Sequence, residues 1–250
     1  MTKRRCLITG GAGGVGTAVA HGLSAAGFHV VVSDLEEGAC QQVVADVEKN
    51  GGSAEAVVLD VTDRAAVEAV FVDQDNKGGI DTLVTSAAIV KAAPILEFSP
   101  EDWSRILEVN LTGTFHCCQC AGRRMVEKGF GRIITISSVN GQIANSHRGA
   151  YSCTKGGVDS LTRLFAAELG GKGVTANAVS PTPVDTPMIK KVHGPKDRKL
   201  WYDQIPAKRY AQPEEVAAAV KYLASEEAGY VNGHTLNLDG GFMASGILLD

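Results

Sequence analysis

Short runs rich in valine and isoleucine alternate along the chain with longer stretches in which apolar residues recur every three or four positions. The short runs have the length and composition of buried β-strands, and the longer stretches have the period of helices that pack on one face. Seven runs fit a strand: residues 6–9, 30–33, 56–59, 82–85, 132–136, 174–179 and 235–238. The alternation predicts an α/β fold in which helices cover both faces of a doubly wound, seven-stranded parallel sheet.

Local signals predict three of the expected helices, and two of these have readable starting points. Val15, Val19 and Leu23 step by four positions between the first two strands and predict a helix with an apolar stripe. Residues 99–102 read Ser-Pro-Glu-Asp, and residues 213–215 read Pro-Glu-Glu. Proline in the first helical turn with acidic residues beside it is typical of a helix N-terminus, so we expect helices to begin at both places.

The composition is that of one globular domain covering residues 1–250. The chain is 44% hydrophobic and 21% charged and has a formal net charge of −4, which excludes intrinsic disorder as its main state. A chain of this length lies near the upper size of a single hydrophobic core. The mild negative charge argues against nucleic acid as a partner.

The cysteines and the chain start bear on the compartment. No pair among the six cysteines has the C-x-x-C spacing of a redox or zinc motif, so we expect reduced thiols. The basic start precedes only three apolar residues, too few for an export signal, and no run of about 18 apolar residues could span a membrane. We therefore expect a cytoplasmic protein without membrane contact. His116 and Cys120 lie four positions apart in a cysteine-rich stretch, but three thiols so spaced cannot face one ion, so no metal site is expected.

A glycine-rich segment lies between the first predicted strand and the first predicted helix. Residues 9–16 read Thr-Gly-Gly-Ala-Gly-Gly-Val-Gly. Glycines permit a sharp turn and a close approach of the backbone to a pyrophosphate, whose charge the helix N-terminus attracts. The pattern predicts a dinucleotide site, and a tight turn without a binding role is the alternative.

Asp34 ends the second strand region and follows Gly16 by 18 positions. This is near the spacing at which an acid accepts hydrogen bonds from an adenosine ribose. Its charge would repel a 2′-phosphate, and the next residue, Leu35, does not compensate it. We therefore expect NAD rather than NADP. Asp34 is also in a position to cap the next helix, and the two roles are compatible.

Tyr151 and Lys155 are four positions apart and share one face of a helix. A nearby ammonium favours the phenolate, and each unit by which a pKa is lowered corresponds to about 1.4 kcal/mol. Ser138 lies 13 positions before Tyr151, at the end of the fifth predicted strand. Ligands of open parallel sheets bind at strand ends of this kind, so these three residues are candidates for the chemistry.

Together these residues make nearly the full chain resemble the single-domain short-chain dehydrogenase/reductases. The matching motifs stand in the family's order: Thr9-Gly10 with Gly14 and Gly16, Asp60-Val61 after the third strand, Asn110 in Val109-Asn110-Leu111, Ser138, and Tyr151 with Lys155. The resemblance implies the family's seven-stranded Rossmann fold and a hydride transfer in which the cofactor supplies the hydride.

Roles for individual residues follow from the resemblance. It implies that Tyr151 is the general acid/base and that Ser138 holds the substrate oxygen. Lys155 would lower the tyrosine pKa and bind the nicotinamide ribose, while Asn110 would support a water relay. Asp60 and Val61 would flank the adenine, and the segment after the sixth strand would meet the nicotinamide. The residues expected to bind the cofactor are Gly10, Gly14, Val15, Gly16, Asp34, Asp60, Val61, Tyr151, Lys155, Pro181, Val184 and Thr186.

Two positions depart from the family pattern. Residues 85–88 read Thr-Ser-Ala-Ala where the family usually has Asn-Asn-Ala-Gly, which removes two amide side chains beside the cofactor. Thr182 follows Pro181 where glycine is usual, which restricts the backbone near the nicotinamide. Neither change touches the proton-transfer residues, so we expect altered cofactor binding and retained chemistry.

Residues 182–212 form the least regular part of the chain and are the expected substrate lid, with a solvated surface helix and linker as the alternative. The segment includes a basic run of five residues: Lys190, Lys191, Lys196, Arg198 and Lys199. This run would either recruit an anionic substrate or form a solvated face. Four residues are expected to line the substrate pocket, each with a packing or surface role as the alternative: Gln142, His147, Met188 and Trp201. Arg148, between His147 and Tyr151, could line the pocket on the same terms.

Three functions remain open at this point. The first is an NAD-dependent oxidoreductase acting on a secondary alcohol or ketone of a sugar, polyol, hydroxy acid or cyclic alcohol. The second is a 3-oxoacyl-thioester reductase acting on an acyl carrier protein or CoA substrate, which Asp34 disfavours because such reductases usually prefer NADPH. The third is an NAD-sensing scaffold without turnover. The resemblance also implies a homotetramer, formed through the helices near Asn110 and Tyr151 and through the C-terminal segment.

Overall fold

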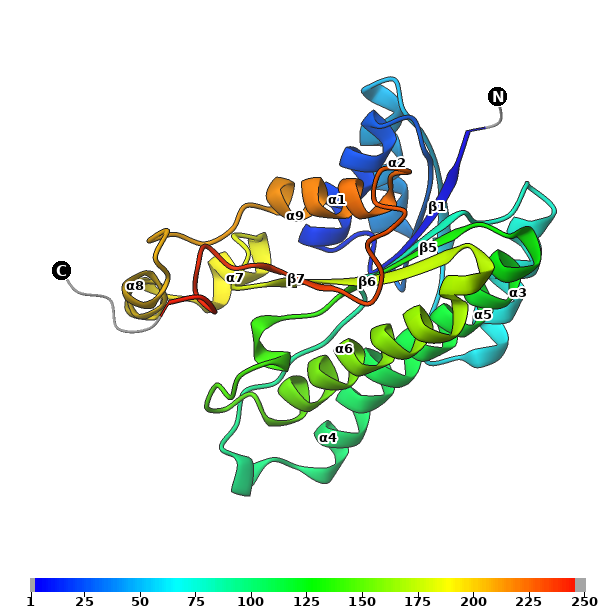
Figure 1. Ribbon diagram of the computed structural model, residues 1–250. Helices are drawn as coiled ribbons and strands as arrows, with labels where there is room; N and C mark the ends of the chain where they lie inside the picture. Colours follow the sequence, from blue (N-terminus) through cyan, green and yellow to red (C-terminus); the bar gives the residue numbers. More distant parts are fainter. Residues whose placement is uncertain (1–2, 246–250) are drawn as a thin grey trace.

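A seven-stranded parallel sheet forms the centre of the computed structural model, which describes residues 3–245. The strand order is β3-β2-β1-β4-β5-β6-β7. The strands are β1 Arg5–Thr9, β2 His29–Asp34, β3 Ser53–Val58, β4 Thr82–Thr85, β5 Gly131–Ile136, β6 Val174–Pro181 and β7 Thr235–Leu238. This is the predicted single-domain Rossmann fold, and each predicted strand overlaps one of these seven (Figure 1).

Helices cover both faces of the sheet (Figure 1). The helices are α1 Gly14–Ala25, α2 Glu37–Lys49, α3 Arg64–Asp75, α4 Pro100–Leu107, α5 Thr114–Lys128, α6 Gly149–Leu169, α7 Pro187–Val192, α8 Pro195–Gln204 and α9 Pro213–Ala224. The helices α1, α2 and α9 pack on one face, and α3, α5 and α6 on the other. The helix predicted from the apolar stripe is α1, and both predicted helix starts are confirmed at α4 and α9. At α4 the Ser99 hydroxyl accepts the Asp102 N–H at 3.1 Å.

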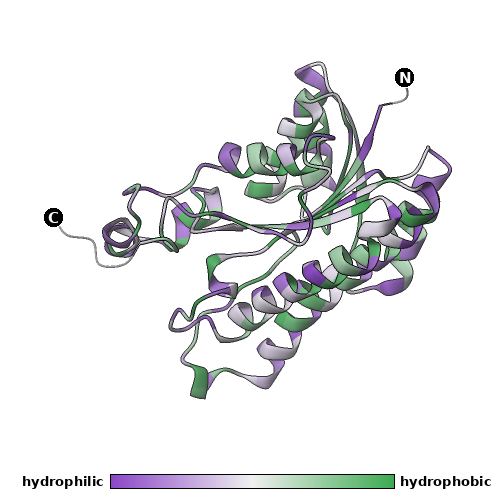
Figure 2. Ribbon diagram, in the orientation of Figure 1, coloured by the Kyte–Doolittle hydropathy of each residue, from purple (hydrophilic) through white to green (hydrophobic). Residues whose placement is uncertain are grey.

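The central strands are buried on both faces because helices lie above and below them. This explains why they are continuous apolar runs rather than alternating ones. Hydrophobic residues gather where the helices meet the sheet, and hydrophilic residues lie on outer helical turns (Figure 2). On one face, α1 approaches α9 closely enough that a Cβ on Gly22 would lie 3.1 Å from the Cβ of Ala217. Among the described residues, no helix is long and apolar enough to cross a membrane.

The interpretation of residues 182–212 as irregular is wrong for half of that segment, because α7 and α8 lie within it. Pro187 and Pro195 each stand in the first turn of a helix, where proline costs no hydrogen bond. The Thr186 hydroxyl caps α7 by accepting the Ile189 N–H at 3.4 Å. These prolines start helices, although in sequence they resemble breakers.

Candidate active site

The main cavity opens at the carboxyl ends of the central strands and has a volume of about 390 Å³. The chain leaves β1 for α1 on one face of the sheet and leaves β4 for α4 and α5 on the other. The crevice between the two strands is the point at which open parallel sheets bind ligands. The residues discussed below are placed around this crevice.

The glycine turn is pressed against the segment that follows β4. Gly10 has a left-handed φ of 64°, and a Cβ there would lie 2.7 Å from the backbone of Ala87. A Cβ on Gly14 would lie 2.7 Å from the side chain of Thr186. Gly10, Gly14 and Val15 line the cavity, whereas Gly16 packs α1 against the Gly10 carbonyl and does not line it. The turn therefore presents bare backbone and a helix N-terminus to the cavity, an arrangement that fits a pyrophosphate.

Asp34 lines the same cavity at the end of β2. Its carboxylate accepts the Ala12 N–H at 3.2 Å and the Leu35 N–H at 2.8 Å, so it supports the glycine turn. The N-cap of α2 is Glu36, so Asp34 does not fill the capping role considered above. A carboxylate with unused lone pairs at this place fits an adenosine ribose.

Asp60 and Val61 lie beside that site, after β3, and both line the cavity. The Asp60 carboxylate accepts the Thr62 N–H at 2.9 Å and the Thr62 hydroxyl at 2.7 Å. These hydrogen bonds lower the pKa of Asp60, so the carboxyl remains ionised and its loop stays fixed.

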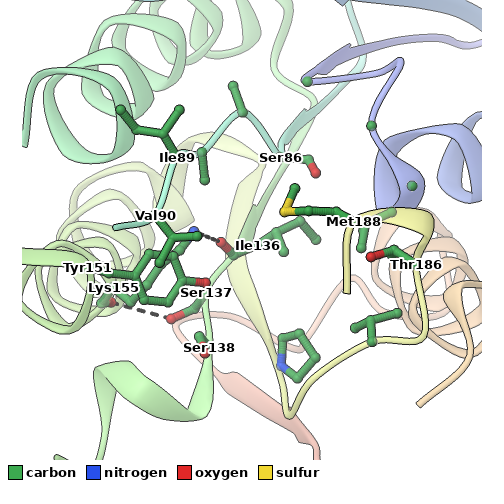
Figure 3. A pocket seen from close by; sticks show the side chains of 18 of the residues that line it. Ser86, Ile89, Val90, Ile136, Ser137, Ser138, Tyr151, Lys155, Thr186 and Met188 are labelled. Atoms are coloured by element: carbon green, nitrogen blue, oxygen red, sulfur yellow. Dashed lines mark hydrogen bonds between the residues drawn. The ribbon is translucent and has the colours of Figure 1, made fainter. Parts of the chain in front are cut away.

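Ser138, Tyr151 and Lys155 meet at the other end of the cavity (Figure 3). Ser138 follows β5, and its hydroxyl accepts the Asn140 N–H at 3.2 Å. Tyr151 and Lys155 lie on one face of α6, as their spacing predicts. The Lys155 ammonium donates to the Ile136 carbonyl at 2.6 Å and lies 5.6 Å from the centre of the Tyr151 ring. The strand end and the helix thus hold all three side chains from opposite sides.

Burial shifts the pKa of both ionisable groups in this set. It raises the pKa of Tyr151, and the hydrogen bond with Ser138 and the charge of Arg148 oppose the rise. It lowers the pKa of Lys155 to about 8, against the charge of Asp159. The direct lowering of the tyrosine pKa by Lys155 stays a prediction, and the Tyr151 phenol is protonated at neutral pH in this structure.

Asn110 is fully buried in the π-helical turn Glu108–Gly113, between α4 and α5. Its amide oxygen accepts the Ile89 N–H at 2.8 Å, and its amide nitrogen donates to the Ile89 carbonyl at 2.9 Å and to the Thr154 hydroxyl at 3.3 Å. Asn110 therefore fixes the loop after β4 against α6. π-Helical turns are frequent at functional sites for this kind of positioning.

The segment after β6 closes the cavity on the side of α1. Pro181, Val184 and Thr186 line the cavity, and Val184 pairs with Ala211 in a short parallel bridge. Thr182 does not have a positive φ, so the side chain in place of the usual glycine does not strain the backbone. That departure from the family pattern is sterically compatible with this fold.

The other departure, residues 85–88, is held by the first strand. The Thr9 hydroxyl accepts the N–H groups of Ser86 at 3.3 Å and of Ala87 at 3.4 Å. Ser86, Ala87 and Ala88 all line the cavity. The segment therefore stays in place without the missing amide side chains and presents a small, largely apolar surface.

The four residues expected near the substrate fall into two groups. Met188, at 58% exposure, and Trp201 line the cavity from α7 and α8, and Met188 faces the Ser137 side in Figure 3. Gln142 and His147 are not among the residues that line it. Gln142 instead donates to Ser180 at 2.9 Å and to Asn237 at 2.6 Å, toward β6 and β7.

Arg148, directly before α6, lines the cavity, as its position between Ser138 and Tyr151 allowed. Several polar or charged lining residues were not predicted, among them Arg105 on α4, Asn140 after Ser138 and His193 after α7. His193 stands in a segment whose course depends on tertiary packing.

The basic run of the lid is largely paired. Arg198 and Lys190 contact Asp185 at 3.0 and 3.6 Å, and Lys199 contacts Asp203 at 2.7 Å.

The two residues weighed as metal ligands contact different partners: His116 contacts the Val61 carbonyl, and Cys120 contacts Glu68. Within residues 3–245 no group of three or more histidine, cysteine, aspartate or glutamate side chains is arranged to hold a metal ion.

Comparisons with known proteins agree with this geometry. A family model described as enoyl-(acyl carrier protein) reductase matches residues 10–243. The 3-oxoacyl-(acyl-carrier-protein) reductase of Synechocystis sp. is 37% identical over 246 residues, covering 97% of this chain and 98% of its own. D-threitol dehydrogenase of Mycolicibacterium smegmatis is 38% identical over 238 residues, covering 94% and 91%. The crystal structure of a gluconate 5-dehydrogenase from Burkholderia cenocepacia J2315, in complex with NADP and tartrate, has a TM-score of 0.94 at 34% identity and covers 98% and 97%.

Proposed function

The chain belongs to the short-chain dehydrogenase/reductase family, and from this premise we propose that it transfers a hydride between NAD(H) and a secondary alcohol or ketone. As a member of that family it is an oxidoreductase that acts on CH–OH groups with a nicotinamide cofactor. The observation that carries the proposal is the grouping of Ser138, Tyr151 and Lys155 at the strand-end cavity. When bound, the cofactor accepts the hydride from the alcohol carbon or returns it to the ketone.

The proton moves through Tyr151 in this proposal. In the oxidative direction the phenolate oxygen takes the proton of the substrate hydroxyl, and in the reductive direction the phenol returns it. Ser138 holds the substrate oxygen by a hydrogen bond, because its hydroxyl lies beside that of Tyr151. The Lys155 ammonium, 5.6 Å from the tyrosine ring, stabilises the phenolate when it forms and binds the nicotinamide ribose.

Asn110 acts as a positioning residue in the same scheme. Its amide ties the Ile89 backbone to Thr154 on α6, three residues after Tyr151. The proposed water relay would pass beside this amide, which links the buried interior to the loop after β4. A fixed loop keeps the tyrosine in reach of the reacting oxygen, and small displacements at such sites cost rate.

NAD is the proposed cofactor. Asp34 lines the cavity at the end of β2, so its carboxylate would repel a 2′-phosphate bound there, and the neighbouring Leu35 is 57% exposed and uncharged. The gluconate 5-dehydrogenase with 34% identity is in complex with NADP, so the fold alone does not set the preference and the proposal rests on Asp34. The proposed cofactor contacts also include Asp60 and Val61 at the adenine and Val184 and Thr186 at the nicotinamide.

Residues 182–212 are proposed to act as the substrate lid within this single domain. Met188 from α7 and Trp201 from α8 reach the cavity, and neither helix contains a buried residue. These two helices bury so little surface that they can open at low cost, as substrate lids do, while the buried Ile205 and Tyr210 anchor the end of the segment.

We also propose a cytoplasmic homotetramer. All six cysteines are free, which is typical of a reducing compartment. Phe115 on α5 and Leu164 on α6 are exposed at 37% and 55%, in line with contacts between copies through these helices. The C-terminal segment expected to take part extends through residues 246–250, which lie outside the described residues.

Reduction of a 3-oxoacyl thioester is the second candidate function, favoured by the similarity to the Synechocystis reductase. The two functions share Tyr151 and differ in cofactor and substrate. Asp34 discriminates between them, because its carboxylate disfavours the NADPH that such reductases usually take.

The test follows nicotinamide reduction by absorbance over secondary alcohols, polyols and hydroxy acids, with NAD and with NADP. Tyr151→Phe serves as the blank. Tyr151-dependent turnover with NAD is expected. If none of these substrates reduces the nicotinamide, and NADPH reduces an acetoacetyl thioester in the presence of the protein, the first function is wrong and the second is supported.

A further inference from the structure

The cavity contains a guanidinium that has no partner. Arg148 stands directly before α6 and lines the cavity beside Tyr151. Its side chain is half-buried, and it makes no hydrogen bond or ion pair with any residue between 3 and 245. Its charge lowers the pKa of both Tyr151 and His193, which places the guanidinium near both side chains. Because none of its nitrogens is both buried and unpartnered, the guanidinium keeps contact with solvent, and its donors can pair with a ligand that enters the cavity.

Other arginines around the cavity are satisfied by the protein itself. Arg198 donates to Asp185 at 3.0 Å, and Arg105 donates to Glu108 at 3.2 Å. The free guanidinium of Arg148 is therefore not a general property of the cavity rim. It is specific to the end that holds Tyr151.

His193 supplies a second donor at this end. Its Nδ1 lies 2.9 Å from the Tyr210 hydroxyl, and burial raises the pKa of Tyr210 to about 12, so that phenol keeps its proton. Burial and the charge of Arg148 lower the pKa of His193, which is therefore neutral near pH 7. When Nδ1 accepts from the Tyr210 hydroxyl, the imidazole proton lies on Nε2 and can be donated to a ligand, and this is the tautomer that the subsite described below requires.

Among the described residues, no acid lines this end of the cavity. The two acids that line the cavity, Asp34 and Asp60, lie at the end of β2 and after β3, at the nucleotide end. In the lid, Asp185 is paired with Arg198, and Asp197 accepts the Gly194 N–H at 3.0 Å. The charge of Asp197 raises the pKa of His193 against the larger effect of burial, but Asp197 does not line the cavity. A ligand that binds near Arg148 therefore meets a cation and neutral donors, with no carboxylate in the cavity wall beside them.

We infer that Arg148 and His193 form a carboxylate subsite and that the substrate is a hydroxy acid, whose hydroxyl meets Ser138 and Tyr151 while its carboxylate binds this pair. The inference rests on the proposed function and names its substrate class. A planar guanidinium binds a carboxylate with two parallel hydrogen bonds, and the imidazole N–H adds a third. The pair moves no proton in the reaction and determines specificity.

Matched substrates test the subsite most directly. Each hydroxy acid is compared with the compound in which CH₂OH replaces the carboxylate: glycerate with glycerol, 3-hydroxybutyrate with 1,3-butanediol, and gluconate with glucitol. In the wild type, kcat/KM for the preferred acid is expected to exceed that of its neutral counterpart by at least about 50-fold, as charge-assisted pairing predicts. Arg148→Met should abolish that preference mainly through KM.

Two further variants separate charge from folding. Arg148→Lys keeps the charge without the planar fork and should recover part of the preference. Arg163→Gln removes an exposed arginine of α6 that does not line the cavity, and it should leave the acid-to-neutral ratio unchanged. Because loss of Arg148 also affects Tyr151, the ratio between matched substrates is the readout rather than the absolute rate.

The outcomes distinguish this inference from the proposed function. Tyr151-dependent turnover that favours neutral alcohols, or an acid preference that survives in Arg148→Met, overturns the subsite and leaves the proposed function intact. If no substrate shows Tyr151-dependent turnover, the proposed function fails. Calorimetric titration of gluconate into the NAD-bound protein then decides the subsite alone: binding lost in Arg148→Met supports it, and absent or Arg148-independent binding overturns it.

Discussion

The floor of the cavity and its lid are built in opposite ways. The floor, formed by the end of β5 and by α6, holds Ser138 at 6% and Lys155 at 4% exposure, and Lys155 is tied to the backbone of the sheet. The lid, residues 182–212, contains two short helices without a buried residue. The sheet and the long helix α6 therefore fix the residues proposed for proton transfer. The residues expected to select the substrate lie instead on two short helices that bury no residue.

The contacts around the two lid helices are polar and aromatic, whereas the buried Ile205 and Tyr210 anchor the segment beyond α8. Within the lid, Asp185 pairs with Arg198 and the His193 ring contacts the Tyr210 phenol, and Trp201 packs on Phe242 with ring centres 5.6 Å apart. The polar contacts are partly solvated, so they cost little to rearrange. Changes in the floor should therefore alter kcat, and changes in the lid should alter KM.

The largest expected effect comes from the floor. Tyr151→Phe removes the proton-transfer hydroxyl and should lower kcat by at least about 100-fold, as loss of a general acid/base predicts. NAD affinity, measured by fluorescence titration, should stay within a few-fold of the wild type. Met188→Ala in the lid is the contrasting variant and should change KM while keeping most of kcat. Near-wild-type turnover by Tyr151→Phe would remove this tyrosine from the mechanism.

Stability sharpens the same contrast, because burial of a charge in the floor destabilises the fold. The pKa of Lys155 falls from 10.5 to about 8, so below pH 8 the lysine is charged in both states and its desolvation cost of about 3 kcal/mol is fully present. Between pH 8 and 10.5 the unfolded chain binds more protons, so the free energy of unfolding rises with pH and the cost fades.

Lys155→Met should therefore raise the free energy of unfolding by about 1–3 kcal/mol near pH 7, with activity lost, and by less near pH 10. The lower bound allows for the lost hydrogen bond to Ile136. Urea unfolding at both pH values measures the change. A variant that is less stable than the wild type near pH 7 would show that the buried ammonium does not strain the floor.

Cofactor choice depends on the nucleotide end of the floor. Asp34→Asn removes the charge while keeping the shape, so the preference for NAD over NADP in kcat/KM should fall by about 10-fold, close to 1.4 kcal/mol. Asp34→Ala should narrow the preference in the same way and also weaken the glycine turn, because the Ala12 N–H loses its acceptor. An unchanged ratio in both variants would exclude contact between Asp34 and the ribose.

The smallest effect is expected in the lid. Asp185→Asn weakens the contacts to Arg198 and Lys190, and partly exposed ion pairs contribute about 1 kcal/mol or less, so KM should rise by no more than about five-fold. Asp203→Asn is the matched control, because it breaks only the exposed pair with Lys199 within α8. A large loss of kcat in Asp185→Asn would contradict the division between floor and lid.

The same division explains what the sequence predicted. Buried parallel strands are valine-rich runs, and the catalytic spacing of Tyr151 and Lys155 follows from helical period alone, so the fold and the floor could be read locally. The lid could not. Its prolines begin helices, and the course of His193 depends on contact with Tyr210, which lies 17 residues further along the same lid, beyond α8. Gly16 lies in the expected motif, yet its role is packing, which only the three-dimensional arrangement distinguishes from binding.

Transfer of deuterium tests the central claim most directly. Secondary alcohols and hydroxy acids deuterated at the carbinol carbon are incubated with the enzyme and NAD, and the reduced cofactor is analysed by mass spectrometry, with Tyr151→Phe in parallel. The proposed function predicts deuterium on the reduced nicotinamide, together with a slowed reaction, in the wild type and almost none in the variant. Reduced cofactor without deuterium, or equal transfer by both proteins, would contradict Tyr151-assisted hydride transfer from a CH–OH group.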